Sequence, residues 1–148
     1  MIAEGKKAVA AVVSAAAIAV TPYCGALFGC GCTWPWAGLD RHCNIHDPAA
    51  PFHCPWCEYP VAGALSVTLA VIAGAMTAGF IDPKDFRLRT WLRDPRGRIL
   101  SKRAAALSEI LARTLLGVGA FFLIAALAAS LTAAVTGFRG SAIWFSIP

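Results

Sequence analysis

The chain has 148 residues, of which 58% are hydrophobic and only 14% are charged. A typical soluble domain carries about 25% charged residues, so the composition argues against a water-soluble globular domain and favours an integral membrane protein. The net charge of +5 would also suit a nucleic-acid partner. The positions of the basic residues around apolar segments already account for it, so no nucleic-acid binding is predicted.

Three segments are free of Asp, Glu, Lys, Arg and His: residues 8–28, 61–81 and 114–135. Each has roughly the 20 residues that a helix needs to cross a bilayer, and none shows the polar stripe of a soluble helix. We therefore predict an all-α integral membrane protein with three transmembrane helices. The expected parts are a first transmembrane helix (residues 1–30), an extracytoplasmic Cys/His/Trp loop (31–60), a second transmembrane helix (61–81), a basic cytoplasmic connection (82–112), a third transmembrane helix (113–136) and an extracytoplasmic tail (137–148).

The first span begins like a secretory signal, because Lys6 and Lys7 precede a run of Ala and Val. No clear small-x-small cleavage site follows the run before Pro22, so we expect the span to be retained as a membrane anchor. Pro22 is expected to kink or end the helix near its outer end, which would leave the segment up to Phe28 irregular.

The basic residues predict the orientation. Lys6 and Lys7 precede the first span, nine further Lys and Arg lie between the second span and the start of the third, and only Arg41 and Arg139 remain. Short loops rich in Lys and Arg stay in the cytoplasm. We therefore expect a multi-pass protein of a bacterial-type inner (cytoplasmic) membrane, with its amino terminus in the cytoplasm and its Cys/His loop outside.

The basic connection is predicted to form two short interfacial helices held by lipid headgroups. Asp82-Pro83 suits the start of a helix, residues 94–97 are a turn signal, and apolar residues from Ile99 onward follow helical spacing into the third span. A docking face for a cytoplasmic partner is the alternative interpretation.

All six cysteines and all three histidines fall between Cys24 and Cys57. Several prolines in the loop prevent a long helix, and the loop is too short to form an apolar core of its own. Cross-links, a metal or neighbouring subunits are therefore expected to order it. Disulfides are one interpretation, because the outer compartment is oxidising; six cysteines allow fifteen pairings, and the sequence does not select among them.

A metal site is the second interpretation. Cys43-x-x-His46 and Cys54-x-x-Cys57 have the spacing that lets a tight turn present two ligands to one ion, and thiolate with imidazole suits copper or zinc. The candidate metal ligands are Cys30, Cys32, Cys43, His46, His53, Cys54 and Cys57.

Thiol–disulfide exchange by Cys54 and Cys57 is the third interpretation, with His53 favouring the reactive thiolate. Several other activities are excluded or disfavoured. The spans contain no histidine for a bis-histidine haem, Glu58 follows Cys57 and so removes a c-type haem motif, and the cysteine spacing differs from common iron–sulfur sites.

A non-catalytic role is favoured over an enzymatic one. We expect an accessory or assembly subunit of a membrane redox or metal-handling complex, with other membrane protein subunits as partners. Its outer loop would be either disulfide-clamped or bound to copper or zinc. The alternative is a membrane thiol–disulfide oxidoreductase with catalytic Cys54 and Cys57.

Overall fold

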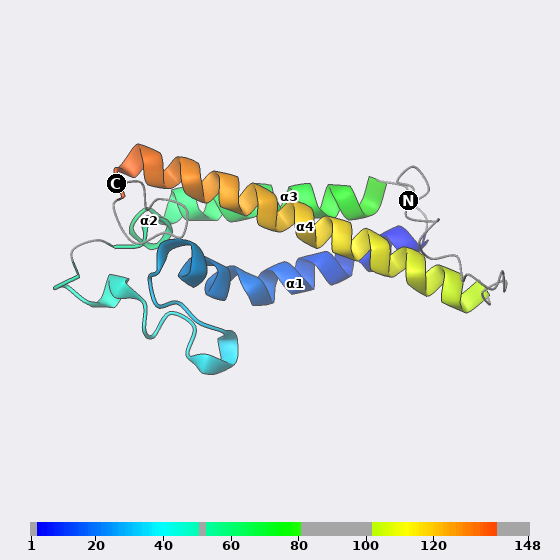
Figure 1. Ribbon diagram of the computed structural model, residues 1–148, viewed down its shortest axis with the longest axis horizontal. Coiled ribbons are helices and arrows are strands. Elements are labelled where there is room, and N and C mark those ends of the chain that lie inside the picture. Colours follow the sequence, from blue (N-terminus) through cyan, green and yellow to red (C-terminus); the bar gives the residue numbers. More distant parts are fainter. Residues whose placement is uncertain (1–2, 51–52, 81–101, 139–148) are drawn as a thin grey trace, which may run out of the picture.

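The computed structural model describes residues 3–50, 53–80 and 102–138. The three long helices are α1 (Ala3–Phe28), α3 (Pro60–Phe80) and α4 (Lys102–Thr136). Successive helices run antiparallel, so α1 and α4 point in the same direction (Figure 1). Each of the three contacts the other two (Figure 1). Short helical turns lie in the connection from α1 to α3, namely η1 (Pro35–Ala37), η2 (Asn44–His46) and α2 (Pro55–Glu58).

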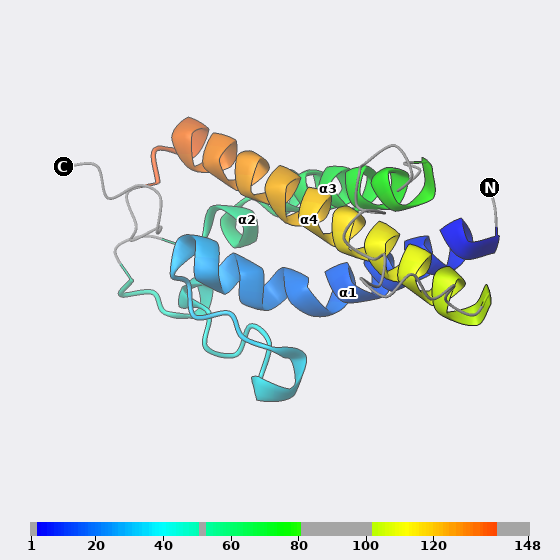
Figure 2. The same cartoon turned by 45° about the vertical axis from the view of Figure 1, so that its right-hand side comes forward.

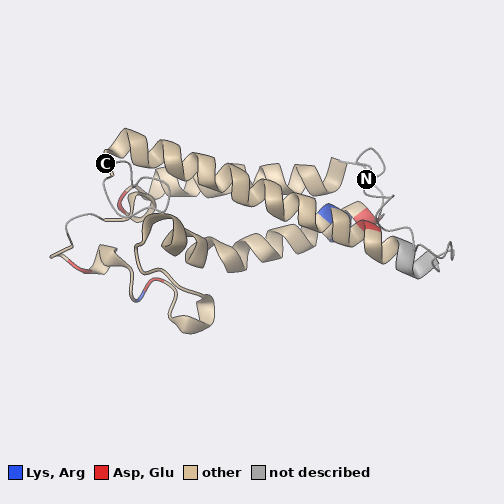
Figure 3. Cartoon of the chain, viewed as in Figure 1, with Lys and Arg blue, Asp and Glu red and all other residues tan. Residues whose placement is uncertain are grey.

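All three long helices are long and apolar enough to cross a membrane, over Glu4–Phe28, Pro60–Phe80 and Ala106–Thr136. The charged side chains of the described residues lie toward the ends of the helices and in the Cys-rich connection, and the middle of each helix carries none (Figure 3). The predicted fold class, an all-helical membrane protein with three spans, is therefore confirmed.

The packing of the helices is inverted relative to a soluble bundle. Small residues face inward, and in α3 the buried positions are Gly63, Ser66, Ala70, Gly74 and Ala78. Large apolar side chains face outward instead, including Leu65, Leu69, Ile72, Met76 and Phe80 on the same helix. Small residues let transmembrane helices approach closely, whereas large apolar ones suit lipid. In α4, Ala125, Ala129 and Ala133 are likewise buried at four-residue spacing.

Gly74 of α3 and Gly117 of α4 mark the closest approach of these helices. A Cβ atom added to Gly74 would lie 2.8 Å from the Gly117 carbonyl oxygen, and one added to Gly117 would lie 2.7 Å from the Gly74 oxygen. Tyr23 ties α1 to α4, since its hydroxyl donates a 2.8 Å hydrogen bond to the Phe122 carbonyl and its ring packs edge-on against Phe122.

Two local features differ from the sequence expectation. The helix α1 continues through Pro22 to Phe28, so the irregular outer segment expected there is absent. Transmembrane helices tolerate proline when neighbouring groups and local adjustments accommodate the freed backbone. The helix that contains the third span already begins at Lys102, ahead of the expected boundary at 113. The turn predicted at 94–97 and the tail at 139–148 lie outside the described residues.

Arg113 is a buried charge near the amino-terminal part of the third span, with 4% of its surface exposed. Its guanidinium donates two hydrogen bonds of 3.1 and 3.0 Å to the Glu109 carboxylate and a longer one of 3.5 Å to the Ala78 carbonyl. Ala78 lies in the last turn of α3, where unpaired carbonyls attract a cation. Arg113 therefore joins the end of α3 to α4.

Candidate metal centre

The six cysteines meet at the end of the bundle where α1 ends and α3 begins. Cys24 lies on the last turns of α1. The connection then turns back beside this end of α1 and brings Cys30, Cys32 and Cys43, and α2 adds Cys57, with Cys54 at its amino-terminal cap (Figures 1 and 2). We refer to this arrangement of six cysteines as the sulfur cluster.

The sulfur atoms are close but not bonded. Sγ of Cys24 is 3.3 Å from that of Cys54 and 3.8 Å from that of Cys30. The Cys30 and Cys32 sulfurs are 3.4 Å apart, and those of Cys43 and Cys57 are 3.8 Å apart. A disulfide bond is about 2.05 Å long, and all six cysteines are free thiols in this structure.

The sulfur cluster contains three sets of three sulfurs, and within each set all sulfurs lie within 4.8 Å of one another. A metal about 2.3 Å from each sulfur, as in zinc–thiolate sites, would hold neighbouring sulfurs about 3.8 Å apart. The measured separations therefore leave space for an ion with little movement. The three trios are Cys24–Cys30–Cys32, Cys24–Cys54–Cys57 and Cys32–Cys43–Cys57.

The sulfur cluster is shielded from solvent. Five of its cysteines are buried, from 0% exposed at Cys54 to 8% at Cys32, and Cys57 is half-buried. The rings of Phe28 and Trp56 pack edge-on at 5.4 Å beside it. Thiols gathered in an apolar, protected site are held apart from bulk water and oxidants, which favours tight binding of a soft cation.

Glycine and asparagine fix the path of the loop around the cluster. Gly31 has φ +83°, and an added Cβ there would overlap the His42 carbonyl oxygen; glycine adopts this conformation without strain. Gly25 on α1 packs directly against the Cys32 carbonyl. The Asn44 backbone N–H donates a 2.8 Å hydrogen bond to the Cys30 carbonyl, and the Asn44 side-chain oxygen accepts one of 3.2 Å from the Cys54 N–H.

The thiols do not share one protonation state. Hydrogen bonds from the Cys24 and Cys54 thiols lower the pKa of Cys30 to about 2 and that of Cys57 to about 3. Burial raises the pKa of Cys43 to about 11 and that of Cys32 further still. Binding of a cation would release the protons that the thiols still hold, as is general for thiolate sites.

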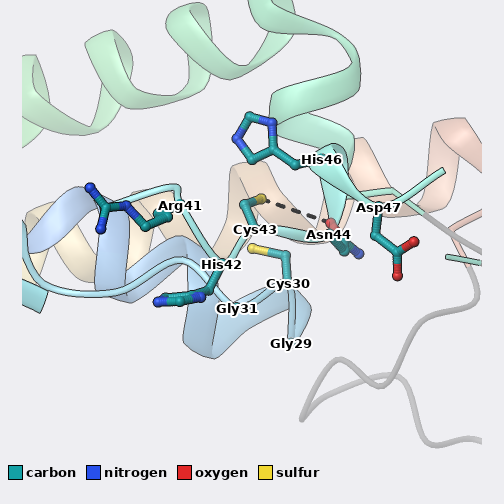
Figure 4. Close-up of a pocket in the computed structure, with 9 residues that line it drawn as sticks. All are labelled: Gly29, Cys30, Gly31, Arg41, His42, Cys43, Asn44, His46 and Asp47. Carbon is teal, nitrogen blue, oxygen red and sulfur yellow. Dashed lines mark hydrogen bonds between the residues drawn. The ribbon is translucent and has the colours of Figure 1, made fainter. Parts of the chain in front are cut away.

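A cavity of about 430 Å³ opens onto one side of the sulfur cluster. Cys30 and Cys43 line its inner wall, and Arg41, His42 and His46 surround it, as Figure 4 shows. This cavity gives Cys30 and Cys43 an approach from outside, and Cys57 is itself partly exposed.

The structure brings together five of the predicted ligands, Cys30, Cys32, Cys43, Cys54 and Cys57, and adds Cys24, which the sequence analysis did not select. The two predicted histidines lie elsewhere. His46 is exposed, with Nε2 3.4 Å from the Asp40 carboxylate, and His53 has its Nε2 3.2 Å from the Asp47 carbonyl oxygen. Cys24 lies four residues before the end of α1. Its nearness in sequence to Cys30 and Cys32 was the one indication that it could join the loop cysteines.

No protein-family model matches the chain, and neither curated proteins nor solved structures include a significant match to it. The chemistry of the sulfur cluster therefore carries the functional argument by itself.

Proposed function

We propose that this protein binds a soft transition metal, copper or zinc, in the sulfur cluster and serves as an accessory or assembly subunit in membrane metal handling. One observation carries the proposal: six cysteines from three separate parts of the chain converge into overlapping trios with metal-ligand spacing. Soft thiolate ligands select Cu(I) and Zn(II) over hard cations such as Mg²⁺ and Ca²⁺.

The spacing of the sulfurs argues against an iron–sulfur cluster. In a [4Fe–4S] cluster each cysteine binds its own iron, so iron and inorganic sulfide stand between the cysteine sulfurs. Here the neighbouring sulfurs are 3.3–3.8 Å apart, which leaves room for single metal ions between them but not for a core that contains sulfide.

Thiol–disulfide exchange by Cys54 and Cys57 is the second candidate, favoured by the lowered pKa of Cys57 and its partial exposure. Exchange also needs Cys54 to be free to attack the mixed disulfide that Cys57 would form with a substrate. Cys54 is fully buried and its closest sulfur contact is Cys24, which supports a ligand role instead.

The exposed part of the connection supports an accessory role. Trp34 and Trp36 stack at 5.1 Å with nearly parallel rings, and both remain exposed together with Leu39. Aromatic side chains of this kind favour the membrane–water interface and protein interfaces. We propose that this end of the bundle faces the outside of the inner membrane and contacts neighbouring membrane subunits.

The test is metal analysis of the full chain, purified in mild detergent under reducing, anaerobic conditions. We expect copper or zinc to co-purify or to bind on titration, and Cys54→Ser to lower the metal content while Asp40→Asn, an exposed change in the same connection, leaves it unchanged. A chain that binds neither metal and instead exchanges disulfides through Cys54 and Cys57 would overturn the proposal.

His46→Ala tests the histidine that the sequence predicted as a ligand. A cluster built of sulfur alone should keep its full metal content in this variant. A loss of metal comparable to that of Cys54→Ser would show that the imidazole turns inward and coordinates the ion.

A further inference from the structure

We propose that the sulfur cluster is a closed thiolate cage for four Cu(I) ions, an inference that rests on the metal-binding function above. The observation behind it is the way in which the trios share their members. Cys24, Cys32 and Cys57 each belong to two trios, whereas Cys30, Cys43 and Cys54 each belong to one.

This sharing pattern is that of an octahedron. If the six sulfurs are its corners, the three trios are three faces that meet only at corners. One further face of the same kind remains, made of Cys30, Cys43 and Cys54. Adding it to the three gives four faces, and every sulfur then belongs to two of them.

The contacts between thiols agree with this geometry. The sulfur pairs within hydrogen-bond distance are Cys24–Cys30, Cys24–Cys54, Cys30–Cys32 and Cys43–Cys57, and each pair belongs to one of the three observed trios. Cys30 and Cys43, which form one edge of the fourth face, line the same cavity. Cys30, Cys43 and Cys54 are not among the sets whose sulfurs lie within 4.8 Å of one another, so the fourth trio closes if these three sulfurs approach as those of the other trios already do.

A face of three sulfurs matches the coordination number of Cu(I) in thiolate sites. Cu(I) is a soft d¹⁰ ion that is satisfied by three thiolates in a plane, and a thiolate can bridge two such ions. One ion on each of the four faces gives every ion three sulfurs and every sulfur two ions. Structural zinc instead takes four ligands in a tetrahedron, whereas the groups of mutually close sulfurs among the described residues have three members.

Loading the cage with copper changes the charge of the cluster but no oxidation state. Four Cu(I) ions bind six thiolates, no electron is transferred, and each thiol still protonated gives its proton to solvent. The product carries a net charge of −2 from six negative sulfurs and four positive ions. The backbone N–H of Cys32 donates to the Cys30 sulfur and that of Ile45 to the Cys43 sulfur, and Arg41 lines the adjacent cavity, so donors and a cation are in place to stabilise this charge.

The experiment is an anaerobic titration of the reduced full chain in detergent with Cu(I) supplied as its acetonitrile complex, followed by native mass spectrometry. We expect the apo chain to convert to a form with four copper ions, with little of the intermediate forms, because bridging sulfurs make binding cooperative. X-ray absorption of the loaded protein should show three sulfurs around each copper and a copper–copper contribution.

The outcomes separate the cage from the function. Saturation at one copper, or independent filling of separate sites, would overturn the cage and leave metal binding intact. Saturation by zinc in tetrahedral sulfur sites, with no polynuclear copper form, would do the same. Failure to bind either metal while the helices stay folded would overturn both.

Cys43→Ser supplies the sharpest variant, because Cys43 belongs to only one of the three observed trios. Independent trios predict the loss of a single copper ion. The cage predicts the loss of at least two ions and of cooperativity, since Cys43 bridges two faces. Asp40→Asn is the matched control in the same connection and should retain all four ions, with circular dichroism confirming that both variants keep their helices.

Discussion

The substitution Gly63→Ala tests whether the contact of α3 with α2 holds the cysteines in place. Gly63 lies in the first turn of α3, and a Cβ added to it would be 2.6 Å from the Trp56 carbonyl oxygen and 3.1 Å from the Trp56 Cβ. A carbon normally stays about 3.3 Å or more from a carbonyl oxygen, so α2 must move away by about 0.7 Å.

This movement is large for a metal centre. Trp56 lies on α2 between Cys54, the cap of that helix, and Cys57, so both sulfurs are expected to move with it. Metal–ligand distances, in contrast, are held to about 0.2 Å. We expect the affinity for Cu(I) to fall by about tenfold or more, as for other changes that displace ligands without removing them. The same substitution should not weaken the helix itself, because Ala stabilises a helix by about 0.5–1 kcal/mol relative to Gly.

The matched control is Gly119→Ala on α4, where an added Cβ would meet no atom within 4 Å. Competition against a chromophoric Cu(I) chelator measures both affinities, and circular dichroism verifies the helices. Equal, wild-type affinity in the two variants would refute the argument that packing of α2 on α3 positions the sulfurs.

Three further predictions concern two contacts within the helix bundle and the orientation of the chain in the membrane. Tyr23→Phe removes the hydrogen bond to the Phe122 carbonyl but keeps the ring contact, so we expect a loss of about 0.5–1.5 kcal/mol in unfolding free energy; an unchanged stability would mean that the bond contributes nothing. Arg113→Ala leaves the Glu109 carboxylate without its partner and should destabilise by about 1–3 kcal/mol. The double variant with Glu109→Ala should then recover part of that loss, and simple additivity would contradict the coupling. Trp36→Cys, at an exposed position, should react with a membrane-impermeant maleimide on intact cells, whereas labelling only after lysis would reverse the predicted orientation.

The three spans could be predicted because the information is local. Blocks of about 20 uncharged residues define transmembrane helices without knowledge of their neighbours. The four-residue spacing of Ala125, Ala129 and Ala133 is likewise a local pattern in the sequence, and the structure buries all three. The burial of Arg113 was not predicted, since it depends on α3 ending beside it, with the Ala78 carbonyl within reach.

The composition of the centre could be predicted only in part. Spacing within Cys43-x-x-His46 indicated a shared ion, but the turn η2 directs Cys43 into the cluster and leaves His46 beside Asp40. Sequence distance says how near two residues lie along the chain, and not which side of a turn each one faces. Cys24 was missed for the converse reason: it belongs to a span by composition, and only the fold shows that the loop returns to it.

The arrangement of the cysteines explains why a loop without its own apolar core is attached to a rigid bundle. A ligand set drawn only from a flexible loop would lose conformational entropy when it orders around an ion. Cys24 is carried by α1 and Cys57 by α2, which packs on α3 through Gly63. These two sulfurs share a trio, and their positions are set by helix packing before any ion binds. Under the proposed function, the buried loop cysteines complete a face that helix packing already holds in part, which would lower the cost of binding a metal and link the sulfur cluster to the packing of the membrane helices.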